Sequence, residues 1–130
     1  MTLTKNTDQL RVLVRERLAA DALVRGQYWK DGKGCFIGCL THSDDPSIAF
    51  ERFGLPEPLT RLCEHIQWEL PDDEGRAFFA AFPDAVDRDG KDLSRVHWAF
   101  LASELRALPK VPDDAQAVID PMIAGMDILA

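Results

Sequence analysis

The chain has 130 residues, 46% of them hydrophobic and 28% charged, which is the composition of a globular domain and excludes a disordered or fibrous protein. The formal net charge is -7, and this acidic balance argues against a nucleic-acid or anionic-membrane surface. No apolar run reaches the ~20 residues of a membrane span, and the N-terminus lacks the apolar segment of a signal peptide. We therefore expect a soluble, cytoplasmic protein whose three cysteines are reduced.

Helical periodicity runs along most of the chain. The first helix is predicted over residues 8–25, where no Gly or Pro interrupts the pattern and Gly26 supplies a stop. A glycine-rich turn, "KDGKG", then leads into a short helix over 35–42. Further helices are predicted over 46–53, 56–70, 72–82, 92–108 and about 113–128. With no alternating strand pattern and no linker, the sequence predicts one all-α domain over residues 1–130, a bundle of five or six helices with a Gly-rich corner.

Apolar stripes indicate which helix faces point inward. In the 56–70 helix the stripe includes a cysteine, and in the 92–108 helix it begins at the first turn. The expected inward residues are Leu59, Leu62, Cys63, Ile66 and Leu70 in the former and Val96, Phe100, Leu101 and Leu105 in the latter.

The corner at residues 30–42, "KDGKGCFIGCLTH", concentrates glycine, cysteine and histidine. Its glycines miss the dinucleotide-binding pattern, since Ile37 stands where the third glycine belongs, and Lys33 lacks the Ser or Thr that must follow it in a phosphate-binding P-loop. If Cys35 begins a helix, backbone N–H groups and Lys33 lower its thiol pKa. On one straight helix Cys35, Cys39 and His42 share a face, although about 10 Å of rise separates the first from the last.

Metal binding and calcium binding are weakly indicated. The C-x3-C-x2-H spacing at the corner is not a common zinc pattern, and Cys63 and His65 point about 160° apart on one helix. The stretch "DRDGKD", residues 87–92, lacks both anchoring carboxylates of a calcium loop and is expected to be a solvated turn that caps the next helix. We expect no metal and no cofactor. Structural packing is the preferred role for the cysteines and for His97.

Three segments of the sequence match, as a set, the pattern of a known family: "GQYWKDGKGCFIGCLTH", "FERFGLPEPLTRLCEHIQWELP" and "DLSRVHWAF". The chain resembles a family of small, uncharacterised bacterial proteins with a Gly-Lys-Gly-Cys, Gly-Cys, His signature, over roughly residues 26–101. The resemblance implies a shared fold and points to the same corner, but it lends no activity, because none is established for that family.

The sequence favours a binding protein over an enzyme, since no catalytic pattern is assembled. We expect it to bind a small molecule or a protein partner at the corner, where polar and small groups meet the aromatic pair Tyr28 and Trp29. One alternative is a thiol-dependent enzyme or redox sensor that uses Cys35 at a helix N-terminus, with Cys39 as resolving thiol and His42 as the base toward Cys39. Another is an acidic regulatory or phage-derived interaction protein, and the apolar C-terminus also permits a homo-oligomer. The candidate ligand-binding residues are Trp29, Lys33, Gly34, Cys35, Cys39 and His42.

Overall fold

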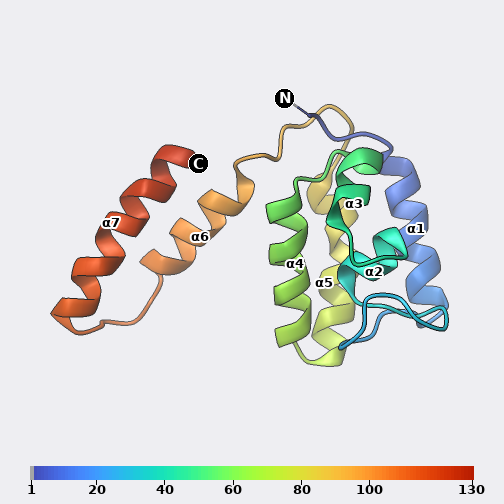
Figure 1. Ribbon diagram of the computed structural model, residues 1–130, viewed down its shortest axis with the longest axis horizontal. Coiled ribbons are helices and arrows are strands. Elements are labelled where there is room, and N and C mark those ends of the chain that lie inside the picture. Colours follow the sequence, from blue (N-terminus) through green and yellow to red (C-terminus); the bar gives the residue numbers. More distant parts are fainter. Residues whose placement is uncertain (1) are drawn as a thin grey trace. The chain divides into compact units, whose positions relative to one another are not determined.

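A computed structural model describes residues 2–130, and over these residues the chain forms seven α-helices and no β-strand (Figure 1). The predicted all-α class is confirmed. The helices are α1 (Thr7–Ala19), α2 (Phe36–Thr41), α3 (Pro46–Phe53), α4 (Glu57–Glu69), α5 (Asp72–Val86), α6 (Val96–Arg106) and α7 (Asp113–Leu129). The chain divides into two compact units, Met1–Leu93 and Ser94–Ala130. None of the helices in the described part of the chain is both long and apolar enough to cross a membrane.

The first unit is built around the aromatic rings of α2 and α5. α4 packs against α2, α3 and α5, while α1 packs against α5 and α2 (Figure 1). The fully buried Phe36 presents its ring edge-on to Phe79 and Phe82, with centroid distances of 5.4 and 4.9 Å. Burial of one such side chain contributes about 1.5–3 kcal/mol to folding. The core therefore fixes the short α2, which carries the corner, against the longer helices.

Three helix ends differ by four residues or more from the sequence prediction, and one of them is the start of α6, which lies at Val96 and not at residue 92. α1 stops at Ala19 and not at residue 25, because Asp21 adopts a left-handed φ of 52° and the chain leaves the helix to pair with the corner. α5 continues through Pro83 to Val86, where an end before the proline was expected. Pro83 removes one backbone donor from the helix but is itself buried against the core, and this packing holds the last turn in place.

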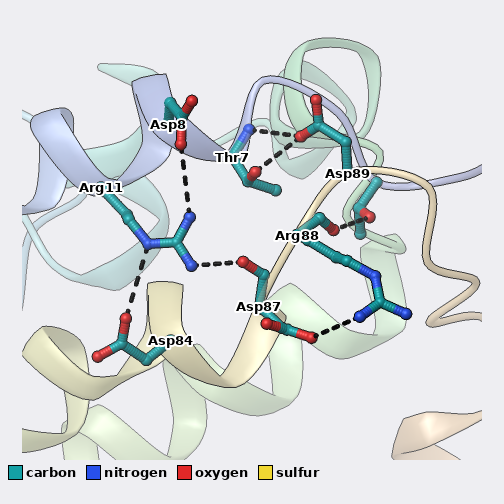
Figure 2. Close-up of polar contacts among 8 residues, drawn as sticks. Thr7, Asp8, Arg11, Asp84, Asp87, Arg88 and Asp89 are labelled. Atoms are coloured by element: carbon teal, nitrogen blue, oxygen red, sulfur yellow. Dashed lines mark hydrogen bonds and ion pairs between the residues drawn. The ribbon is translucent and has the colours of Figure 1, made fainter.

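The acidic loop after α5 secures the start of the chain. Asp89 accepts hydrogen bonds from both the backbone N–H and the hydroxyl of Thr7, at 2.9 and 2.7 Å, and so caps the N-terminus of α1 (Figure 2). Arg11 lies between Asp8 and Asp84, at 3.7 and 3.6 Å, and also donates to the Asp87 carbonyl. The segment at 87–92 is thus an exposed loop, as predicted, but the prediction that it caps the next helix is wrong: Asp89 caps α1, and the N-cap residue of α6 makes no side-chain cap hydrogen bond in the described chain.

The second unit is a helical hairpin of α6 and α7. The two helices pack against each other, and an Arg106–Asp127 ion pair joins them. Val96 and Phe100 were predicted to face inward, but they are 43% and 38% exposed. A hairpin of two helices buries only one stripe of each, and on α6 this stripe consists of the buried His97 and Ala102 with the half-buried Leu101 and Leu105.

Candidate functional site

The corner begins with a tight two-residue turn. The backbone N–H of Lys30 donates to the Lys33 carbonyl at 2.8 Å, and the Lys33 N–H donates to the Lys30 carbonyl at 3.1 Å. Asp31 and Gly32 between them have φ angles of 56° and 75°, the left-handed pair that an Asp-Gly sequence favours in a type I′ turn. The turn places Lys33 directly before Gly34, whose N–H and carbonyl pair with Ala22 and Val24.

Gly34 and Gly38 permit a close approach of two backbone segments. A Cβ atom at either position would overlap the carbonyl of Tyr28, which crosses the start of α2 at this point. The spacing of these glycines thus reflects backbone packing between the loop and α2. It follows that Gly34, one of the predicted ligand-binding residues, has a structural requirement of its own.

Two buried polar side chains of α4 cap the N-terminus of α2. Glu64 Oε2 accepts a hydrogen bond from the Ile37 N–H at 2.6 Å, and Gln67 Oε1 accepts one from the Phe36 N–H at 3.3 Å. Sequence reasoning missed both residues, because it followed the apolar stripe of α4. A signal was present: Thr60, Glu64 and Gln67 recur at i, i+4 and i+7, the spacing of a second buried stripe.

The thiols of the corner are sealed from solvent. Cys35 and Cys39 are both 0% exposed. Burial raises the pKa of the Cys35 thiol to about 12, and the nearby Glu64 carboxylate acts in the same direction. Burial likewise raises the pKa of Cys39 to about 11 and that of Cys63 to about 12. The Cys35 shift is opposite to the one that the helix N-terminus and Lys33 predict, because desolvation exceeds the attraction of the N–H groups.

His42 does not share a face with the two cysteines. It ends α2 in a left-handed conformation, φ 59°, and its ring stacks on Trp29 with a centroid distance of 4.2 Å and an interplanar angle of 7°. Arg17 completes the group: it contacts His42 Nε2, donates to the Cys39 carbonyl at 3.0 Å and lies 5.1 Å from the Trp29 ring centroid. Desolvation and the neighbouring charges of Arg17 and Arg52 lower the pKa of His42. A neutral imidazole can accept the Arg17 N–H, so this cluster ties α1 to the end of α2.

Lys33 lies at a separate place, where its exposed side chain lines a surface cavity of about 260 Å³ that we call the cationic cleft. The cleft brings together the cations Arg25, Lys33 and Arg76 and the carboxylates Asp21 and Asp72. Arg25 pairs with Asp72 and Arg76 with Asp21, each at 2.7 Å. Within residues 2–130 the Lys33 ammonium has neither an ion pair nor a hydrogen bond. The cleft therefore holds one more cation than carboxylates, on a chain whose net charge is negative.

A second, smaller cavity of about 70 Å³ lies at Glu64, and we call it the carboxylate pocket. Glu64 lines this pocket, and its second carboxylate oxygen, Oε1, is buried without a hydrogen-bond partner in the described chain. Tyr28 and Trp68 form an aromatic wall, with ring centroids 6.5 Å apart. The lining residues are Tyr28, Ile37, Arg61, Glu64, His65 and Trp68.

The structure thus distributes the predicted site residues over several places. Lys33 lines the cationic cleft, Trp29 and His42 stack together with Arg17, and Cys35 and Cys39 are enclosed beneath the turn. Across the described residues, no three His, Cys, Asp or Glu side chains are grouped so that they could hold a metal ion.

Comparison of the chain with protein-family models, with curated proteins and with solved structures found no match. The resemblance to the family with the Gly-Lys-Gly-Cys signature therefore stays a prediction. The geometry of the corner and its two cavities is the basis for the proposals below.

Proposed function

We propose that the protein binds a small anionic molecule in the cationic cleft, and that it acts by binding and not by catalysis. The observation that carries this proposal is the Lys33 ammonium, which lines a cavity together with two guanidinium groups and has no partner of its own among residues 2–130. A volume of about 260 Å³ is close to the lower end of ordinary ligand pockets, which begin at about 300 Å³. The expected ligand is therefore a compact phosphate or carboxylate.

The two arginines of the cleft are already oriented. Besides its aspartate, Arg25 donates to the Trp68 carbonyl at 3.4 Å, and Arg76 donates to the Leu18 carbonyl at 3.2 Å. Side chains that are held before binding lose less conformational entropy when a ligand arrives. Guanidinium N–H groups that remain unused can then bind an anion in the planar geometry that carboxylates and phosphates favour.

The chemistry of the thiols gives less support to a redox or thiol-dependent activity. Thiolate is the reactive form of cysteine, and burial raises the pKa of Cys35 and Cys39 to about 12 and about 11. With both sulfurs fully buried, a substrate would have to open the corner before it met either of them. For this reason we place the ligand at Lys33 and not at the cysteines.

Titration with inorganic phosphate and with succinate, at constant ionic strength, tests the proposal. Calorimetry or amide chemical shifts should give saturable binding of at least one of the two anions, and K33Q should weaken it by about fivefold or more, because it removes the unpaired charge. The matched control is K30Q, which removes a lysine from the same turn but not from the cleft. Equal losses in K33Q and K30Q would mean that the effect is general electrostatics, and the proposal would then be wrong.

A further inference from the structure

A buried carboxylate oxygen without a partner is the most unusual polar feature of the first unit. Glu64 is 6% exposed, and its Oε2 atom is used by the Ile37 N–H at 2.6 Å. Its Oε1 atom has no hydrogen-bond partner in the described chain, and the Cys35 S–H, which interacts with this carboxylate, is only a weak donor. An unsatisfied buried acceptor is costly, and more so when it carries charge. The hydrogen bond from Ile37 to Oε2 is enough to cap the N-terminus of α2. Capping therefore does not explain why Oε1 is left without a donor.

The free oxygen belongs to a cavity that can supply the donor. The carboxylate pocket has a volume of about 70 Å³, enough for a few water molecules or for the tip of one side chain. Its walls combine the carboxylate with the aromatic side chains of Tyr28 and Trp68 and with apolar Ile37. A whole drug-sized molecule does not fit, so the pocket would receive one terminal group of a larger ligand.

The chemistry of these walls selects a cationic donor. An ionised carboxylate only accepts hydrogen bonds, and aromatic faces attract cations through their quadrupole. The cation already present, Arg61, is engaged by Glu57 at 3.3 Å, and its N–H groups do not reach Oε1. An anionic group would be repelled by Glu64 at close range. A primary ammonium on an alkyl chain meets all three conditions: it donates to Oε1, it packs on the aromatic wall, and it is small enough to enter.

We infer that the carboxylate pocket is a binding site for a primary alkylammonium group, which donates to Glu64 Oε1 between Tyr28 and Trp68. This site is distinct from the cationic cleft, because the two cavities have no lining residue in common. The ammonium can come from a free amine or from a lysine side chain on a peptide, and the same experiment distinguishes these sources.

The test is a titration with n-butylammonium chloride, followed by the indole N–H resonance of Trp68. Trp29 and Trp98 serve as internal references, since neither lines the pocket. We expect a saturable shift confined to Trp68, which equal concentrations of sodium chloride or n-butanol do not produce. A parallel titration with acetyl-Gly-Lys-Gly-amide assigns the source: tighter binding of the peptide indicates a lysine side chain, and tighter binding of the amine indicates a free amine.

The variant E64Q removes the charge but keeps an oxygen that can accept from Ile37. It should weaken n-butylammonium binding by about tenfold or more, the usual effect of losing a charge-assisted hydrogen bond. A second variant, Y28L, leaves Glu64 and the Trp68 reporter untouched and removes the other aromatic side chain of the pocket, and it should weaken binding as well. K33Q should bind n-butylammonium as the wild type does, which separates this inference from the function proposed for the cleft. If neither amine nor peptide gives a saturable shift, or if E64Q binds as tightly as the wild type, the inference is wrong and water satisfies Oε1.

Discussion

Glu64 on α4 and Ile37 on α2 are joined by a 2.6 Å hydrogen bond from a backbone N–H to a buried carboxylate. This contact connects the short helix of the corner to α4, and it leaves the other carboxylate oxygen for the pocket. The same residue is therefore a structural cap and the candidate binding group. Its two roles can be separated by substitution.

Replacing Glu64 by alanine should destabilise the protein. E64A leaves the Ile37 N–H buried without an acceptor, which costs about 1–3 kcal/mol of unfolding free energy. E64Q should cost less, because its amide oxygen can take the place of Oε2. Chemical denaturation of both variants measures the difference. The control is E69A on the exposed side of the same helix, which should stay within about 0.5 kcal/mol of the wild type; a similar loss in E69A and E64A would contradict the cap.

Two glycine-to-alanine substitutions in helices of the first unit should have opposite effects. At Gly38 the added methyl group overlaps the Tyr28 carbonyl, a backbone atom that cannot move without breaking the corner, so G38A should lose about 3 kcal/mol or more. At Gly75 a Cβ meets Gln67 at ordinary van der Waals distances of 3.5–3.9 Å, and G75A should gain about 0.5–1 kcal/mol from the stiffer helix. Thermal unfolding of the two variants gives the signs; a tolerated G38A would show that the corner packs more loosely.

G75A should also affect binding in the cationic cleft. Gly75 lines that cavity, so its new methyl group occupies space that a ligand would use. We expect phosphate or succinate to bind G75A more weakly although the fold is more stable. A gain in stability together with weaker binding is a combination that general unfolding cannot produce. Unchanged affinity in G75A would place the ligand elsewhere.

The three thiols should be inert in the folded protein. Burial raises the pKa of Cys35 and Cys63 to about 12 and that of Cys39 to about 11, so almost no thiolate is present at pH 8. Reaction with a chromogenic disulfide reagent should proceed at the rate of protein opening and become fast for all three only in denaturant. A native thiol that reacts rapidly with a midpoint near pH 8.5 would restore the redox alternative.

The cap on α1 should make stability depend on pH. Hydrogen bonds from Thr7 hold the pKa of Asp89 below its usual value. Because the folded-state pKa is depressed, the contribution of Asp89 is complete above the unfolded pKa of about 3.9 and is lost as the pH falls through the folded pKa. The difference in unfolding free energy between wild type and D89A should therefore be constant near neutral pH and narrow on acidification.

A double-mutant cycle with T7V isolates this contact. T7V removes the hydroxyl donor but keeps the backbone donor of Thr7. The effects of D89A and T7V should be less than additive, since both break one interaction. Full additivity would mean that the Thr7 hydroxyl contributes nothing to the cap, which would leave only the backbone N–H and the charge of Asp89.

The sequence by itself determined the helical class, most of the helix positions and the presence of a turn at the corner. These follow from local rules: apolar residues at helical spacing, proline and glycine at the ends, and an Asp-Gly pair that tolerates positive φ at Asp31 and Gly32. Only the tertiary structure decided what surrounds each corner residue. The Tyr28 carbonyl that requires Gly38, the desolvation that raises the pKa of Cys35, and the pairing of Glu64 with Ile37 all join segments that are distant in sequence. No periodicity within one helix encodes such contacts, because they depend on which faces of α2 and α4 meet, and that is set by the packing of the whole core.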